Sequence, residues 1–211
     1  MKGLFTIYVE GVADVVFFKQ YIHHVLGVEV PENSIVKLDG WTNLKGAAWQ
    51  QRMKTMTDNG GTNIVIIDAD KDIDARRSDI LKWKQDNGLE FELFLLPNDK
   101  DAGALEDLLE NIINPNNKPI FECWEGYEKE LVKLDIPGRT PPPLTTPAKK
   151  TKIYGYLEAL LGESKSQKEL IKEPNRDYEN PKHWNLDAEY LGALKGFLER
   201  NIKEETNYGK T

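Results

Sequence analysis

The hydrophobic positions near the start of the chain follow two different periods. Residues 4–9 are mostly β-branched or aromatic, which favours a buried strand. This run ends at Glu10 and Gly11, and apolar residues then recur at helical spacing. The recurring apolar residues are Val15, Val16, Phe18 and Ile22. The pattern therefore predicts a strand, a tight turn at Glu10–Gly11, and a helix.

The same alternation continues to about residue 114. Strands are predicted over 34–38, 63–67 and 91–96, and helices over 43–57, 75–88 and 104–113. The run NIVII at 63–67 is uninterrupted, as in a central strand that is buried on both faces. Strands that alternate with helices predict a parallel sheet covered by helices on both sides. The predicted fold class is α/β, a Rossmann-like three-layer arrangement over residues 1–114.

The remainder of the chain has a different pattern. Helices are predicted over 119–134, 150–162 and 185–202. The segment 135–150 holds five of the chain's eleven prolines, so it is predicted to be an extended connection. We expect residues 115–202 to form a helical appendage packed on the first unit, and residues 203–211 to be a frayed tail.

Composition narrows the class of protein. The chain has 211 residues, and its single cysteine excludes an internal disulfide framework and a cysteine-built zinc site. No secretory signal or membrane-spanning apolar run is recognisable, so a cytoplasmic location without membrane association is expected. The formal net charge of −7 argues against coating nucleic acid through bulk charge. It allows an enzyme that contacts nucleic acid through a local basic patch and a bound metal ion.

Acidic residues follow two of the predicted strands. Glu10 follows the first strand, and Asp68, Asp70 and Asp72 follow the strand at 63–67. The carboxyl ends of parallel strands share one edge of the sheet, so these carboxylates are expected to converge. Converging carboxylates stay ionised together only if a cation neutralises them, and their oxygens suit Mg²⁺ or Mn²⁺. The sequence therefore predicts a metal site that supports phosphoryl transfer.

These acidic residues also fit other roles. Asp72 can cap the following helix, and Asp70 can be a solvated turn residue. A calcium loop starting at Asp68 would need glycine and glutamate where Ile73 and Asp79 stand, which excludes it. An aspartyl-phosphate hydrolase is disfavoured because Lys71 follows the acidic pair and a complete strand–helix unit precedes it. The glycine-rich phosphate-binding motifs of nucleotide enzymes do not occur in the sequence.

Two segments together resemble a known family. YVEGVADVV at 8–16, followed by IVIIDADKD at 64–72, is similar to the Toprim domain of topoisomerases, bacterial primases and the overcoming-lysogenization-defect (OLD) nucleases. The whole chain, with AGALEDLL at 102–109 and KTKIYGYL at 150–157, resembles a small uncharacterised bacterial Toprim-like family related to those nucleases (DUF3226-like). The gate, zinc-binding and ATPase modules of the larger relatives are not recognisable in the sequence.

The resemblance implies a role for particular residues. Glu10 matches the catalytic glutamate, which is also a metal ligand in some members, and Gly11 and Asp14 match the supporting residues of the same motif. Asp68, Asp70 and Asp72 match metal-binding aspartates. Glu106 resembles a further metal-binding acid of the OLD nucleases, and Lys150 and Lys152 resemble the lysines that contact phosphate there. The implied cofactor is Mg²⁺ or Mn²⁺.

Two functions stay open. The first is a metal-dependent nuclease, for which nucleic acid is the expected partner. The second is a non-catalytic sensor or adaptor in a genome-defence system, which binds metal, nucleotide or a protein partner such as an ATPase. A decayed Toprim fold that binds no metal is a third possibility. The five tryptophans, Trp41 among them, are scattered along the sequence and are expected to serve packing rather than base stacking.

Overall fold

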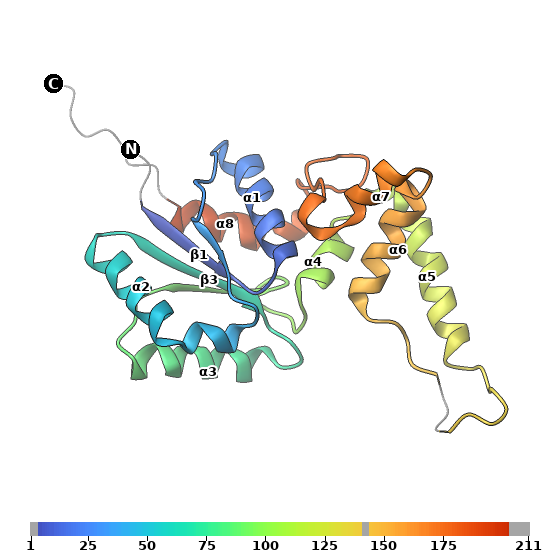
Figure 1. Cartoon of the computed structure of the whole chain (residues 1–211), viewed down its shortest axis with the longest axis horizontal. Helices are drawn as coiled ribbons and strands as arrows, with labels where there is room; N and C mark the ends of the chain where they lie inside the picture. Colours follow the sequence, from blue (N-terminus) through green and yellow to red (C-terminus); the bar gives the residue numbers. More distant parts are fainter. Residues whose placement is uncertain (1–3, 141–143, 203–211) are drawn as a thin grey trace.

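A four-stranded parallel sheet forms the centre of the molecule. In a computed structural model, which describes residues 4–140 and 144–202, the strand order is β2-β1-β3-β4 (Figure 1). The strands are β1 (Phe5–Val9), β2 (Ile35–Lys37), β3 (Thr62–Asp68) and β4 (Glu92–Leu96). All three neighbouring pairs are parallel, and Ile7 of β1 lies opposite Ile64 of β3. The predicted α/β class and its alternating order are therefore confirmed.

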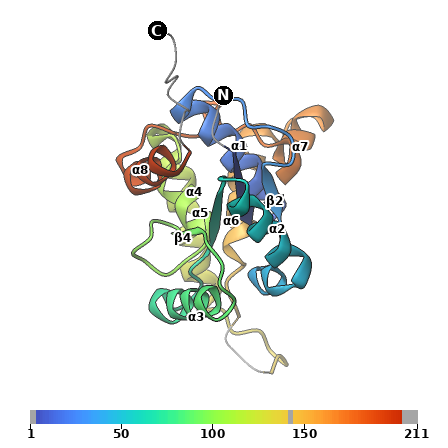
Figure 2. The same ribbon diagram turned by 90° about the vertical axis from the view of Figure 1, so that its left-hand side faces the viewer.

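Helices cover both faces of the sheet, as the continuous apolar strands require. One hydrophobic cluster joins one face of the strands to α1 (Val12–Leu26), α4 (Leu105–Asn111) and α8 (Gly192–Asn201). A second cluster joins the opposite face to the 3₁₀ helix η1 (Trp41–Lys45), α2 (Ala47–Asp58) and α3 (Ile73–Asp86). Figure 2 shows α1 and α8 on one side of the strands and α3 on the other.

The remaining helices extend the first cluster beyond the sheet. They are α5 (Lys118–Leu131), α6 (Lys149–Leu161) and α7 (Lys165–Ile171), with short 3₁₀ turns η2 (Pro115–Asn117), η3 (Glu173–Asn175) and η4 (Glu189–Leu191). Helices α5 and α6 run side by side next to α4 (Figure 1). Buried residues of α6 belong to the same cluster as the sheet face, so one apolar core connects the sheet with this part of the chain.

Three segments differ from the predicted pattern. The helix expected over 185–202 starts only at Gly192, because Asn185 accepts a hydrogen bond from the N–H of Asp187 and its own N–H bonds to Ile112. The helix expected over 43–57 is divided at Gly46 into η1 and α2. Helix α7 was not predicted, although Ser164 and Gln167 form a capping box at its start.

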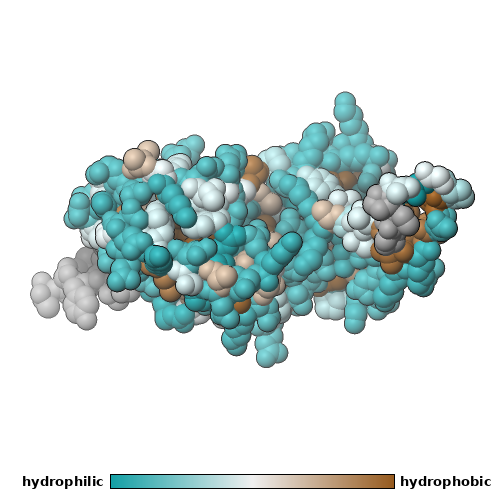
Figure 3. Space-filling model, turned by 90° about the horizontal axis from the view of Figure 1, so that it is seen from below, coloured by the Kyte–Doolittle hydropathy of each residue, from teal (hydrophilic) through white to brown (hydrophobic). Residues whose placement is uncertain are grey.

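The predicted proline-rich connection contains turns but no helix or strand over 135–140 and 144–148. It starts earlier and ends earlier than expected, because α5 ends at Leu131 and α6 begins at Lys149. Its residues 141–143, and the tail expected over 203–211, lie outside the described residues. Exposed apolar side chains, including Leu134 and Ile136, follow α5 at this end of the molecule, where Figure 3 shows hydrophobic surface beside the grey atoms. Among the helices of the described ranges, none has the length and apolar content to cross a bilayer.

Candidate active site at the edge of the sheet

The carboxyl ends of β1 and β3 meet at the point where the chain changes direction across the sheet. The chain continues from β1 to β2 on one side, and from β3 to β4 on the other. In open α/β sheets, ligands bind in the crevice outside such a switch point. Glu10 directly follows β1, and Asp68 is the last residue of β3. Strand pairing therefore brings these two predicted residues together.

Backbone N–H groups hold three of the carboxylates in place. The N–H of Asp68 donates to Glu10 Oε1 at 3.3 Å, and the N–H of Leu105 donates to Asp68 Oδ1 at 3.1 Å. The N–H of Gly11 donates to Asp14 Oδ2 at 3.0 Å, and Asp14 is only 7% exposed. Leu105 is the first residue of α4, so the start of this helix approaches the end of β3. The next residue along, Glu106, is thereby brought to the same edge.

The charges of these carboxylates act on one another. Burial, followed by the charges of Asp14, Glu10 and Glu106, raises the pKa of Asp68 from 3.8 to about 8, and the N–H of Leu105 opposes this only in part. Burial, with smaller contributions from Glu10 and Glu106, raises the pKa of Asp14 from 3.8 to about 7. We call Glu10, Asp14, Asp68 and Glu106 the acidic cluster. Its members cannot all ionise without a compensating cation.

Polar groups from three parts of the chain act on Glu10. Burial raises its pKa, and the N–H of Asp68, the guanidinium of Arg76 and the N–H of Trp41 oppose this change. Trp41 was expected to serve packing alone, yet its backbone faces a candidate catalytic group. Its place in the sequence could have indicated this, because Trp41 comes three residues after the predicted end of the second strand and so lies near the same edge of the sheet as Glu10.

Two further predicted metal ligands, Asp70 and Asp72, have protein partners. Asp70 is exposed, has a left-handed backbone with φ of 56°, and forms an ion pair with Arg76. Its N–H donates to the carbonyl oxygen of Gly103 at 2.9 Å. Asp72 caps α3, where its side chain accepts the N–H of Ala75 at 3.0 Å. Neither residue is among the charges that shift the pKa of Asp68.

The two predicted lysines differ in their surroundings. Lys152 is only 7% exposed, and its Nζ lies 2.9 Å from Glu110 Oε2 and 4.9 Å from the centre of the Phe121 ring. Lys150 is exposed, and its Nζ lies 2.5 Å from Glu173 Oε1. The hydrogen bond that Lys150 donates to Glu173 is the main cause that raises the pKa of Lys150, and the charge of Glu106 adds a small contribution. Lys150 is therefore the predicted lysine whose charge reaches the acidic cluster.

The donor set of the acidic cluster suits a hard cation, because carboxylate oxygens are the ligands that Mg²⁺ and Mn²⁺ prefer. As the side chains stand, the described residues include no group of three or more His, Cys, Asp or Glu residues gathered to hold a metal ion. Glu10 and Asp68 each place one carboxylate oxygen against a backbone N–H. Glu10, Asp68 and Glu106 are the residues that could supply oxygens to a cation.

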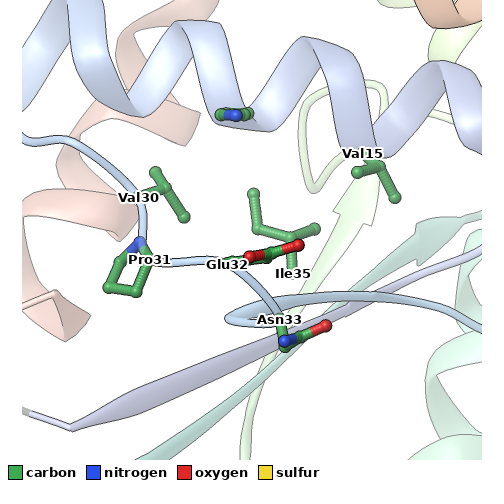
Figure 4. A pocket seen from close by; sticks show the side chains of 7 residues that line it. Val15, Val30, Pro31, Glu32, Asn33 and Ile35 are labelled. Carbon is green, nitrogen blue, oxygen red and sulfur yellow. The ribbon is translucent and has the colours of Figure 1, made fainter.

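A separate pocket of about 350 Å³ lies between α1 and the loop that leads into β2. Figure 4 shows Val15 of α1 across this space from Val30 and Ile35. The described residues that line it include no member of the acidic cluster. The cluster, and not this pocket, is therefore the candidate site.

Fold and site together define an α/β protein with a parallel sheet and an acidic switch point. Residues 5–203 match the model of a family described as "Protein of unknown function (DUF3226)", and the chain belongs to that family. This match confirms the family resemblance expected from the sequence, and it leaves the Toprim relationship a proposal. The chain has no significant match among curated proteins or among solved structures.

Proposed function

We propose that this protein is a Toprim-type, Mg²⁺- or Mn²⁺-dependent phosphoryl-transfer enzyme that cleaves phosphodiester bonds in DNA or RNA. The observation that carries the proposal is the acidic cluster, in which carboxylates from α1, β3 and α4 lie near enough to Glu10 for their charges to act on one another. Burying several like charges together is unfavourable, so a cation or a proton must neutralise part of the charge. Groups with such perturbed pKa values are often found at functional sites.

In this proposal each residue of the site has a separate role. Glu10, Asp68 and Glu106 would hold the metal ion, which, when bound, neutralises phosphate charge and lowers the pKa of an attacking water. The Glu10 carboxylate, which accepts the N–H of Asp68 at Oε1, would accept the proton from that water. Lys150, whose charge reaches Glu106, would balance the charge of the phosphate.

The Toprim relationship is supported by the order and position of the acids. A glutamate after the first strand and an aspartate at the end of a neighbouring parallel strand are the arrangement that this relationship requires. The second aspartate, Asp70, departs from it because Arg76 engages that carboxylate. We expect Glu106 from α4 to serve in place of Asp70, because its charge acts on Asp68.

A thermal melt with and without Mg²⁺ or Mn²⁺ tests the metal site. An ion that binds only the folded protein stabilises it by about 2.7 kcal/mol at a hundredfold excess over its Kd. For a chain of this size that corresponds to a rise in Tm of about 5–10 °C. We expect this rise in the wild type and its loss in Asp68→Asn. Asp79→Asn removes the same charge from an exposed position on α3, and this control should keep the rise. If millimolar metal leaves the wild-type Tm unchanged, the metal-dependent proposal fails.

Cleavage of a quenched fluorescent oligonucleotide then tests the chemistry. Wild type should release fluorescence with Mg²⁺ or Mn²⁺ and not with EDTA. Glu10→Gln should lose activity by at least about a hundredfold while its fold is retained, because it removes the proton acceptor. Equal activity in this variant would contradict the role of Glu10.

A second candidate function is the non-catalytic sensor or adaptor. The ion pair between Asp70 and Arg76 and the capping role of Asp72 favour it, because two expected ligands then serve the fold. This candidate predicts that the biological effect survives Asp68→Asn, whereas the enzyme proposal predicts that it is lost.

A further inference from the structure

The segment that follows β2 is positively charged in an acidic protein. Residues 38–58 contain three basic residues, Lys45, Arg52 and Lys54, and two acidic residues at the ends of the segment, Asp39 and Asp58. The segment therefore has a net charge of +1 in a chain of net charge −7. The segment forms η1 and α2, which cover the second face of the sheet. Arg76, which forms an ion pair with Asp70, approaches it from α3. We call Trp41, Lys45, Trp49, Arg52 and Arg76 the η1–α2 surface.

Aromatic rings and cations are paired on this surface. Lys45 Nζ lies 4.1 Å from the centre of the Trp41 ring, and the Arg76 guanidinium lies 5.3 Å from it. Arg52 lies 5.9 Å from the centre of the Trp49 ring. Both tryptophans are half-buried, so each packs on the core and keeps part of its ring at the surface.

The η1–α2 surface adjoins the acidic cluster. The carbonyl oxygen of Glu10 accepts hydrogen bonds from the N–H groups of Asp39 at 3.0 Å and Gly40 at 3.4 Å. The N–H of Trp41 faces the Glu10 carboxylate, and the charge of Arg76 acts on the same carboxylate. A ligand that lies on the Trp41 ring would therefore also lie beside the candidate catalytic glutamate.

The loop that presents Trp41 is held in one unusual conformation. Asp39 and Gly40 are consecutive residues with positive φ, 58° and 102°. The Asn43 side chain bridges this loop by donating to the carbonyl oxygens of Leu38 and Asp39, each at 2.8 Å. A left-handed backbone at a non-glycine residue is unfavourable, and it persists where the surrounding structure maintains it. Trp41 is thus presented by a rigid loop.

We propose that the η1–α2 surface binds the unpaired bases of single-stranded nucleic acid, with one base stacked on Trp41. Surfaces that bind single strands combine aromatic rings for the bases with cations for the backbone, and this surface has both. Lys45 is exposed on a flexible stem, so it can leave the ring to an incoming base and pair with a phosphate. Paired bases cannot stack on a side chain without being unstacked, which selects for a single strand.

This inference deepens the proposed function, because it names the substrate class of the same site. Binding itself requires neither the metal ion nor cleavage. The two proposals can therefore fail separately when binding is measured in EDTA.

The test is the fluorescence anisotropy of a fluorescein-labelled oligothymidylate, titrated with the full chain in EDTA at low salt. We expect Trp41→Ala to raise the Kd by about tenfold or more, the loss expected for one stacked base, and Trp41→Phe to lie between it and the wild type. Lys45→Ala should reduce the slope of log K against log salt by about 0.7, the share of one phosphate contact on a single strand.

Matched controls separate stacking from general effects. Trp124 is a half-buried tryptophan on α5 and Lys133 is an exposed lysine beyond that helix, so Trp124→Ala and Lys133→Ala should change the Kd by less than about twofold. Equal Tm values for wild type and Trp41→Phe show that this substitution leaves the fold intact.

Three results would overturn the inference. They are an absence of oligothymidylate binding by the wild type, a Kd that Trp41→Ala leaves unchanged, and tighter binding of a duplex than of the single strand. Binding that depends on Trp41, without any metal-dependent cleavage, would support the inference and refute the proposed enzyme activity.

Discussion

Replacing Asp68 by asparagine should stabilise the metal-free protein at high pH. Asp68 is largely buried, and burial together with three neighbouring carboxylates raises its pKa from 3.8 to about 8. Asparagine keeps a side-chain oxygen for the N–H of Leu105, which donates to Asp68 at 3.1 Å. The substitution therefore removes the charge and preserves the hydrogen bond.

The sign of the effect follows from linkage. A carboxyl group whose pKa is higher in the folded state binds its proton more tightly there, so its contribution to stability is complete below the unfolded pKa of 3.8. This contribution decreases as the pH rises and is gone above about pH 8. A pKa change from 3.8 to about 8 corresponds to at most about 6 kcal/mol. Water reaches part of the side chain, so we expect about 3 kcal/mol.

Urea unfolding in EDTA, followed by tryptophan fluorescence between about pH 4 and pH 9, measures this effect. Wild type and Asp68→Asn should have nearly equal stability at the acidic end. The free energy of unfolding of the variant should exceed that of the wild type by about 3 kcal/mol at the alkaline end. Asp79→Asn removes the same charge from an exposed position on α3, and it should differ from wild type by less than about 0.5 kcal/mol throughout.

The reasoning is refuted if Asp68→Asn is no more stable than wild type at pH 9, or if the difference between the two proteins does not change with pH. Either result would mean that ionised Asp68 is not disfavoured in the folded protein. The electrostatic argument for a cation at the acidic cluster would then have no basis.

Two further predictions concern parts of the fold around the site. In Gly155→Ala, the added Cβ would lie 2.6 Å from Cζ3 of Trp124, so α5 and α6 must shift and the protein should lose about 1–3 kcal/mol. Gly126→Ala in α5 is the matched control, because its added Cβ would have no neighbouring atom within 4 Å. This control should raise the free energy of unfolding by up to about 1 kcal/mol, since alanine favours a helix more than glycine does. Equal urea midpoints for the two variants would contradict the contact between Gly155 and Trp124. Asp72→Ala should cost about 1 kcal/mol through loss of the α3 cap and leave any Mg²⁺-induced rise in Tm unchanged, whereas a smaller rise would indicate that Asp72 is a ligand after all.

Much of the sheet could be predicted from the sequence because its signals are local. Residues 64–67 are all apolar, and a strand buried on both faces requires such a run. The convergence of Glu10 with Asp68 also followed from sequence, because parallel strands end at a common edge. The extent of the last helix did not follow, since the hydrogen bond from Asn185 to Ile112 joins residues far apart in the chain.

The sequence by itself determined the alternating elements, the parallel sheet and the first two acids of the site. Only the tertiary structure decided which of the other candidate side chains lie beside them. Glu106 comes to Asp68 because α4 begins beside the end of β3, whereas Asp70 turns to Arg76 and Lys152 turns to Glu110. Trp41 reaches Glu10 through a loop whose backbone bonds to β1. The physical reason is that periodicity records which face of an element is buried, while the neighbours of a polar side chain depend on how distant elements pack.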